Sequence, residues 1–289
     1  MKQQLRALFS HVLDKVDSAQ AMHIPMAWQQ RCRGESLLVI AFGKAARRMA
    51  GELPALLPNT PMRGLVVPPE QDAAPLPPFE ILAGGHPLPT EGSLRAGRRA
   101  LQLARSVRHD EVVLFLISGG GSAMLEAPAD DAVTLEELRA LNQGLIASGA
   151  KIEHINIVRR HLSALKGGRL ALAAAAAKWH CNLVISDVPE DATPAIASGP
   201  TVPESSSLDD CREILDRYSL WPLVPAVLQQ RMQRGDLPPP MPPMHAVARA
   251  SEMILLLNER HASAAAIATA HDYGWVVDSE CDVDDWPYQ

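Results

Sequence analysis

The stretch VVLFLISGGGSAM, Val112 to Met124, runs from a strongly apolar segment into three consecutive glycines, with Ser118 and Ser122 on either side. Residues 112–117 are typical of a buried strand, and the glycines that follow mark a turn at its end. Apolar strands that alternate with helices along a chain form a parallel sheet that is covered on both faces. The stretch therefore predicts one unit of an α/β fold.

The same alternation recurs on both sides of this stretch. Further apolar strands are expected at residues 36–42, 64–67, 182–186, 253–257 and 275–278. Helical patterns are expected at residues 45–50, 93–107, 134–149, 157–177 and 261–274. Thr134 and Glu137 have capping-box spacing at the start of one helix, and Gly149 is placed to end it. The pattern predicts an α/β fold with a doubly wound, mostly parallel sheet and helices on both faces.

Two segments near the ends of the chain predict the domain organisation. Residues 1–20 form an amphipathic helical pattern with Leu5, Leu8, Val12 and Val16 on one side, so we expect them to pack on a larger body. Residues 235–243 contain five prolines and are typical of a linker or of a loop that crosses the surface. We interpret residues 1–289 as one domain.

Composition limits the partners and the compartment. The chain has 289 residues, 47% hydrophobic content and a formal charge of −6, which gives no reason to expect nucleic acid or an anionic membrane as a partner. The apolar run at residues 170–177 is too short to cross a bilayer. The cysteines form no C-x-x-C pair, which argues against a disulfide framework and a zinc site. A cytoplasmic location is predicted.

The glycine cluster is the first candidate for chemistry. Three adjacent glycines, Gly119, Gly120 and Gly121, let main-chain N–H groups approach an anion closely, and Ser118 and Ser122 add hydroxyl groups. A tight turn without a ligand is the alternative. The cluster matches neither common nucleotide signature, because G-x-x-x-x-G-K-[ST] is absent and G-x-G-x-x-G fails at Met124.

Two charged residues follow other predicted strands. Lys44 comes after Gly43 at the start of a helical pattern, where free N–H groups already favour anions. Its alternative is a solvated surface lysine. Asp187 follows the strand at 182–186, so we expect it to face the same crevice as Ser118 and to ligate Mg²⁺ or accept a hydroxyl proton. Its alternative is to cap the following turn.

Positive charge concentrates in residues 159–169. Arg159 and Lys166 are seven residues apart, so on a continuous helix they share a face that can point at a phosphate or carboxylate. Arg160 is expected to face solvent, and His161 is expected to be a structural histidine.

Five segments in order resemble one enzyme family. These segments are FGKAA (42–46), GGHPLPTEGSLRAG (84–97), LISGGGSAM (116–124), SGAKIEHINIVRRHLSALKGGRLA (148–171) and ISDVPEDATPAIASGPTVP (185–203). Together they closely resemble the glycerate 2-kinases that carry a MOFRL C-terminal domain. The resemblance implies a Rossmann-like first domain and transfer of the ATP γ-phosphoryl group, with Mg²⁺, to the 2-hydroxyl of D-glycerate.

The resemblance also implies roles for particular residues. Lys44 matches the family's catalytic lysine, Asp187 matches a functional aspartate in the cleft, and Ser118 to Ser122 match the glycine loop that holds substrate or phosphate. Asp187 would orient or deprotonate the hydroxyl, or hold the metal, and the sequence does not decide between these roles. Small-molecule partners, a hydroxy acid and ATP, are expected.

Two departures from the family pattern bear on activity. Glu190 stands where related sequences usually have glycine, and the MOFRL domain, which closes the cleft and supplies an arginine, is not found before Gln289. We expect a homo-oligomer or a separately encoded C-terminal domain to complete the site. The alternatives are a hydroxypyruvate reductase, whose dinucleotide fingerprint is missing, or a binding domain without catalysis, which the missing C-terminal half favours.

Overall fold

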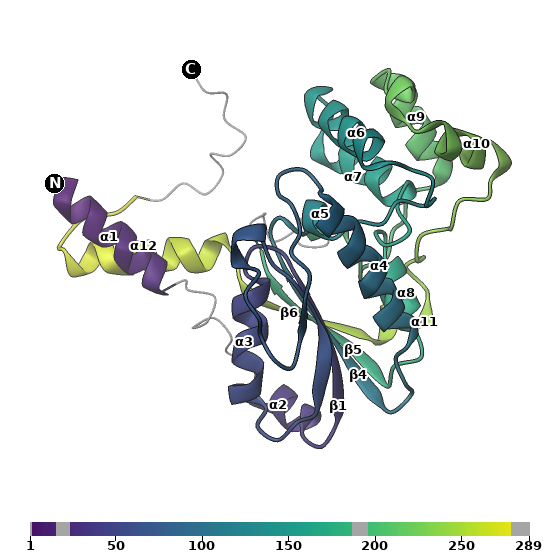
Figure 1. The fold of residues 1–289 in the computed structure, drawn as a ribbon. Helices are drawn as coiled ribbons and strands as arrows, with labels where there is room; N and C mark the ends of the chain where they lie inside the picture. The colour runs from purple at the N-terminus through teal and green to yellow at the C-terminus, as the bar shows by residue number, and fades with distance from the viewer. Residues whose placement is uncertain (1, 16–23, 187–195, 279–289) are drawn as a thin grey trace.

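The centre of the molecule is a six-stranded parallel sheet. The computed structural model describes residues 2–15, 24–186 and 196–278, and its strands follow the order β3-β2-β1-β4-β5-β6 (Figure 1). They are β1 (Ser36–Phe42), β2 (Met62–Val67), β3 (Glu80–Ile81), β4 (Glu111–Ser118), β5 (Trp179–Ile185) and β6 (Ser251–Leu257). The chain builds outward from β1 to β3 and then returns to build from β4 to β6. The order therefore reverses between β1 and β4, as in doubly wound folds.

The two central strands are almost wholly buried. All eight residues of β4 are buried, and β1 is buried from Leu37 onward. The two strands pair in parallel, with Ser36 opposite Glu111 and Phe42 opposite Ile117. Because the register is even along the whole pair, both strands end at the same edge of the sheet.

Helices cover both faces of the sheet, as the sequence predicts. On one face, α2 (Met26–Cys32) and α3 (Ala46–Leu56) pack Trp28, Met49 and Leu53 against side chains of β1 and β4. On the other face lie α4 (Glu91–Arg105), α5 (Gly121–Met124), α8 (Arg169–Ala173) and α11 (Ala246–Ala250). Neighbouring residues of a strand point to opposite faces, so each strand contributes to both apolar layers. A short 3₁₀ turn, η1 (Glu70–Asp72), follows β2.

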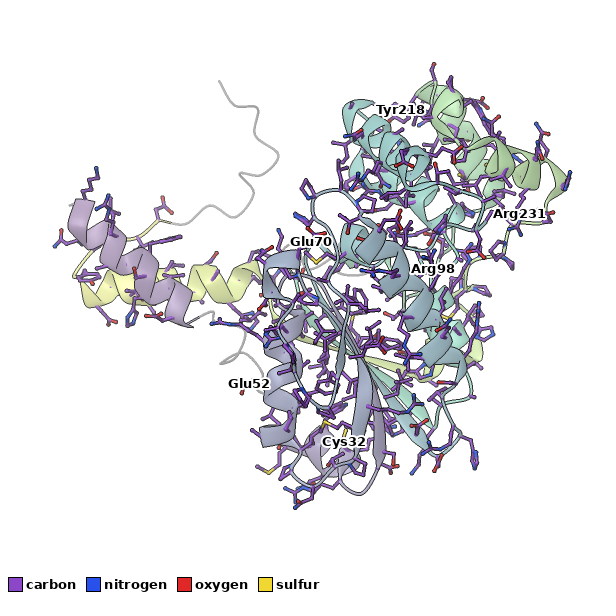
Figure 2. All side chains as sticks on the ribbon, viewed as in Figure 1. Cys32, Glu52, Glu70, Arg98, Tyr218 and Arg231 are labelled. Carbon is purple, nitrogen blue, oxygen red and sulfur yellow. The ribbon has the colours of Figure 1, made fainter. Side chains whose placement is uncertain are left out.

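A second hydrophobic core lies apart from the sheet faces. It joins α6 (Leu135–Ala147), α7 (Ile152–His161), α9 (Leu208–Arg217), η3 (Trp221–Leu223) and α10 (Ala226–Arg234), which Figure 1 shows as a separate group beside α5. Leu138, Leu145, Leu215 and Leu228 are buried in it. The group's labelled residues in Figure 2 are Tyr218 and Arg231. We call these five elements the helical group.

The helical group contains the cap that the sequence predicts. The Thr134 side chain accepts a hydrogen bond from the Glu137 N–H, and the Glu137 carboxylate accepts one from the Thr134 N–H. α6 ends at Ala147, and Gly149 has a φ of +70°.

The N-terminal helix makes a smaller contact than expected. It spans Lys2–Lys15 as α1 and lies along α12 (Glu259–Asp272), and the two project away from the sheet (Figure 1). Leu5 and Phe9 remain 49% and 63% exposed. The expected packing on a larger body is therefore wrong for the described residues, because a single helix covers α1.

Two expected elements differ from the structure. The helix at 157–177 is interrupted, because α7 ends at His161 and α8 begins at Arg169, with Gly167 and Gly168 at φ of +62° and +76° between them. Residues 275–278 are not a strand. The Trp275 N–H donates to the Ala270 carbonyl, so this segment folds back on the end of α12.

The proline-rich segment at 235–243 is a packed loop. The Met241 N–H donates to the Gly167 carbonyl at 2.8 Å, and the Arg169 guanidinium donates to the Pro238 carbonyl. β6 follows this loop and pairs with β5. The loop therefore joins α10 of the helical group to α11 and β6 of the sheet. None of the helices in the described ranges is long and apolar enough to span a membrane.

We predict that Thr134→Ala lowers the free energy of unfolding by about 1 kcal/mol, because the first turn of α6 loses its side-chain acceptor. Urea denaturation measures the difference. Ser10→Ala, at an exposed position inside α1, is the matched control and should change stability by less than about 0.5 kcal/mol. Equal stability of the two variants would contradict a contribution of the cap.

Candidate functional site

The candidate site lies where β1 and β4 end side by side. The Lys44 N–H donates to the Gly119 carbonyl at 2.9 Å, and the Ala45 N–H donates to Ser118 Oγ at 3.0 Å. The turn after β1 is thus joined directly to the glycine loop after β4. The structure brings together Lys44 and the glycine loop, which the sequence singles out separately, at the point where open α/β sheets bind ligands.

Two glycines are required by this close approach. Gly43 has a φ of +111°, and a Cβ atom there would lie 2.3 Å from the Ser118 carbonyl oxygen. Gly120 has a φ of +84°, and a Cβ atom there would lie 3.0 Å from the His86 ring and 3.3 Å from Lys44 Cγ. Side chains therefore crowd around Gly120, and Lys44 and His86 are its neighbours.

Lys44 offers positive charge at this point. Its side chain is exposed, and within the described part of the chain no carboxylate pairs with it. The acceptors found among the described residues leave the N–H groups of Gly120, Gly121 and Ser122 without a main-chain partner. An uncompensated ammonium beside free N–H groups is a suitable environment for a phosphate.

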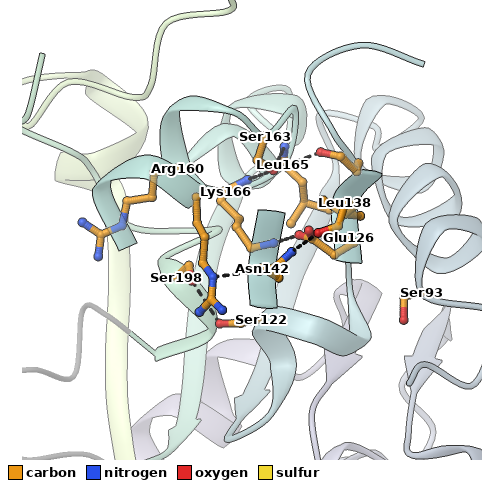
Figure 3. A network of polar contacts seen from close by, with 12 residues as sticks. Ser93, Ser122, Glu126, Leu138, Asn142, Arg160, Ser163, Leu165, Lys166 and Ser198 are labelled. Atoms are coloured by element: carbon orange, nitrogen blue, oxygen red, sulfur yellow. Dashed lines mark hydrogen bonds and ion pairs between the residues drawn. The ribbon is translucent and has the colours of Figure 1, made fainter. Parts of the chain in front are cut away.

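The far end of the glycine loop is tied to the helical group. Ser122 Oγ lies 3.0 Å from Ser198 Oγ, and the Ser198 hydroxyl donates to Asn156 Oδ1 at 2.9 Å (Figure 3). Because the Ser198 proton is used in that bond, Ser122 donates to Ser198. Ala197 and Ser198 have φ of +53° and +58°, which is a left-handed backbone conformation. Residues other than glycine adopt it only at a cost in free energy.

Arg159 lies one turn after Asn156 on α7. Its Nε donates to Asn142 Oδ1 at 2.9 Å, and burial lowers the pKa of the guanidinium. No described carboxylate lies within ion-pair distance of it. Arg159 is therefore a second uncompensated cation on the side of α7 that holds the glycine loop.

Lys166 is placed differently. Its side chain is 2% exposed and forms an ion pair with Glu126, which follows α5 (Figure 3). Burial lowers the pKa of Lys166 to about 7, and the Glu126 carboxylate opposes this shift by favouring the charged form. The shared helical face expected for Arg159 and Lys166 is wrong, because the helix ends between them.

The two neighbours of Arg159 on α7 are accounted for by local contacts. The Arg160 side chain is 16% exposed and forms an ion pair with Glu204, so the expectation that it faces solvent is wrong. His161 is buried, and its Nε2 lies 3.0 Å from Ser206 Oγ. Burial, together with the Arg169 charge, lowers the pKa of His161. It is a structural histidine, as predicted.

Sequence reasoning missed four polar residues around the site: Glu126, Asn142, Asn156 and Ser198. Asn156 and Arg159 have the i, i+3 spacing of one helix face, which is a usable signal. The other three lie in segments far apart in the sequence, and no spacing rule connects them to the glycine loop.

Asp187 and Glu190 lie outside the described residues. The chain reaches the site edge just before them, because Ile185 pairs with Ser118 across β4 and β5. In the ranges that the structure describes, no group of three His, Cys, Asp or Glu side chains could hold a metal ion. The suggested metal role of Asp187 stays a prediction.

The fold and the glycine loop define a Rossmann-like α/β domain whose candidate site lies at its switch point. A family model described as "Domain of unknown function (DUF4147)" matches residues 4–233. A solved glycerate kinase structure from Thermotoga maritima superposes with a TM-score of 0.79 at 32% identity, over 95% of this chain and 63% of that one.

Curated relatives match the same part of the chain. D-glycerate 2-kinase from Thermotoga maritima is 42% identical over 187 residues, which is 64% of this chain and 44% of the relative. A relative from Agrobacterium vitis that bears the name hydroxypyruvate reductase is 40% identical over 221 residues, 76% of this chain and 49% of the relative. The chain belongs to the DUF4147 family, and these matches confirm the glycerate 2-kinase family recognised from its motifs. It spans about half the length of the curated relatives that it matches.

We predict that Lys166→Met lowers the free energy of unfolding by about 3–5 kcal/mol, because it leaves the Glu126 carboxylate buried without a partner. The double variant Lys166→Met with Glu126→Leu should recover most of this loss, since neither charge then remains. Chemical denaturation of the single and double variants measures the coupling. A single variant that loses less than about 1 kcal/mol would show that the pair is solvated.

Proposed function

We propose that this chain is the phosphotransferase domain of a glycerate 2-kinase, which moves the γ-phosphoryl group of ATP to the 2-hydroxyl of D-glycerate. The observation that carries the proposal is the exposed, uncompensated Lys44 beside Gly120 in a loop with free N–H groups. The names of the relatives from Thermotoga maritima support the same reaction.

The residues at the switch point suit the electrostatics of phosphoryl transfer. Catalysis of this reaction depends mainly on cations and N–H donors that stabilise charge on the transferring group. In this proposal Lys44 and the N–H groups of Gly120 to Ser122 hold that group, and Ser118 fixes the turn that presents Lys44. Gly119 contributes its carbonyl, which holds the Lys44 backbone.

Three further residues complete the proposal. Arg159 binds an anionic group of the substrate. Asp187 acts on the hydroxyl proton or holds Mg²⁺. Lys166 belongs to the anion site only if it leaves Glu126, so its proposed role depends on that pair opening.

The cofactors are ATP and Mg²⁺. The glycine loop fits a phosphate, because a side chain at Gly120 would fill the space beside Lys44. When bound, the metal neutralises phosphate charge.

The wider setting is also part of the proposal. The working enzyme is cytoplasmic and has a homo-oligomer or a C-terminal domain as its partner, and the C-terminal domain closes the site. Closure excludes water from the reacting group and adds charge stabilisation.

Two other functions are alternatives. Relatives from Agrobacterium vitis bear the name hydroxypyruvate reductase, but the chain has no dinucleotide fingerprint with an acidic residue about 20 positions on. A domain that binds glycerate or nucleotide without turnover is the other alternative.

We expect the purified chain to form 2-phosphoglycerate from D-glycerate, ATP and Mg²⁺, and Lys44→Ala to lower kcat by about 100-fold or more, because a cation at the transferring group is lost. Lys178→Ala removes another exposed lysine and is the control, with unchanged kcat. Circular dichroism checks the fold of both variants.

Each alternative has its own outcome in this assay. Oxidation of NAD(P)H with hydroxypyruvate would identify a reductase. Binding of D-glycerate without product would identify a binding domain. Normal kinase activity of Lys44→Ala would remove Lys44 from the mechanism.

A further inference from the structure

Asn142 fixes the direction of the Arg159 side chain. Asn142 lies on α6 and is buried, and its Nδ2 donates to the Leu138 carbonyl one turn earlier at 2.9 Å. Its Oδ1 accepts the Arg159 Nε–H at 2.9 Å. The amide has only one orientation that satisfies both bonds, because a carbonyl oxygen only accepts and the Nε–H only donates. Asn142 is therefore a rigid acceptor for one of the five N–H groups of Arg159.

This contact leaves the outer end of the guanidinium available. With Nε occupied, the two terminal amino groups remain, and they form a planar fork that matches the two oxygens of a carboxylate. None of the hydrogen bonds within the described residues uses either terminal nitrogen of Arg159. The guanidinium is thus held at Nε, and its two terminal nitrogens have no hydrogen-bond partner among the residues that the structure describes.

The charges around Arg159 favour an anion. Arg159, Asn142 and Glu126 line one cavity of about 20 Å³, which has room for no more than a water molecule and whose other walls are mainly apolar side chains of the helical group. Glu126 is neutralised there by its ion pair with Lys166. The three ionisable side chains, Arg159, Glu126 and Lys166, therefore sum to one positive charge. Because burial already lowers the pKa of the guanidinium, an incoming carboxylate would relieve an unfavourable charge.

The position of Arg159 relates it to the glycine loop. Asn156, one turn before Arg159, holds Ser198, and Ser198 holds Ser122 at the end of the loop. Lys44 lies beside Gly120, two residues earlier in the same loop. Two residues of chain span at most about 7 Å, so Gly120 and Ser122, which contact Lys44 and Ser198 respectively, lie close together.

We propose that Arg159 receives the carboxylate of the hydroxy acid and that Asn142 is the positioning residue that aims it. The proposal rests on the function proposed above and adds a division of labour between two cations. Lys44 serves the phosphoryl group, and Arg159 selects substrates with a carboxylate next to the hydroxyl carbon. Neutral polyols such as glycerol lack the carboxylate that Arg159 binds in this proposal.

The test measures D-glycerate binding to the full chain by calorimetry, with glycerol as the neutral analogue. Asn142→Leu keeps the size of the side chain and removes the acceptor, so Kd for D-glycerate should rise about tenfold or more. Asn142→Asp keeps an acceptor but neutralises the fork, so it should weaken D-glycerate binding as well. Arg159→Lys keeps the positive charge but loses the two terminal amino groups, so Kd for D-glycerate should rise in this variant too.

A matched control separates positioning from packing. Asn182 is also buried, and its amide bonds to Ser251 and to the Glu252 carbonyl, away from the glycine loop. Asn182→Leu should lower the melting temperature and leave Kd for D-glycerate within about twofold. In the kinase assay, Asn142→Leu should raise KM for D-glycerate and leave KM for ATP unchanged.

The outcomes are distinct. If the unsubstituted chain binds D-glycerate and Asn142→Leu binds it equally well, the role of Asn142 is refuted while the proposed function stands. If Asn142→Asp retains the original affinity, Arg159 does not bind the carboxylate. If the unsubstituted chain neither binds D-glycerate nor phosphorylates it, the proposed function fails, and this inference fails with it.

Discussion

The parallel pairing of β1 with β4 is the constraint on which the rest of the structure depends. Both strands are buried in the middle of the sheet, and their even register makes them end together. The chain must then turn away twice in the same small space. Gly43 and Gly120 meet this demand, because both have left-handed backbone conformations and neither position has room for a Cβ atom. The main-chain bond from Lys44 to Gly119 follows directly from this crowding.

Most of the sheet was predictable because buried parallel strands have continuous apolar sequences. The expected strand at 36–42 coincides with β1, the expected strand at 112–117 falls inside β4, and the expected strand at 182–186 overlaps β5 as far as Ile185. The α6 cap was predictable because a capping box is local in sequence. Periodicity alone was sufficient for α4 and α12, but it failed after residue 161. The alanine-rich segment after residue 161 continues a helical pattern, but Gly167 and Gly168 and the hydroxyl of Ser163 give its backbone other partners.

The site divides in the same way. Lys44 and the glycine loop were predictable because each follows a strand, and the ends of parallel strands meet at one edge. Glu126 and Asn142 were not, since their significance comes from tertiary contacts with Lys166 and Arg159 that no spacing encodes. In the sequence, Lys166 looks like a surface cation because it lies in a basic stretch. Only the structure shows that it is buried and paired with Glu126. The sequence therefore identified candidate residues, but it could not tell a cation without an ion-pair partner among the described residues, such as Lys44, from a paired one, such as Lys166.

The helical group has its own hydrophobic core, so the molecule contains two packed bodies, which contact each other through Ser122 and Ser198 and also along α4, because Leu94 packs in the core of the helical group. In the proposed arrangement, one end of the substrate rests on the sheet body through Lys44 and the other on the helical group through Arg159. A bound acid would then act as a cross-link between the two bodies. Part of the binding free energy would offset the entropy lost when the two bodies stop moving relative to each other. Loss of the hydrogen bond between Ser122 and Ser198 would therefore weaken affinity for the acid, even though no contact with the acid itself is lost.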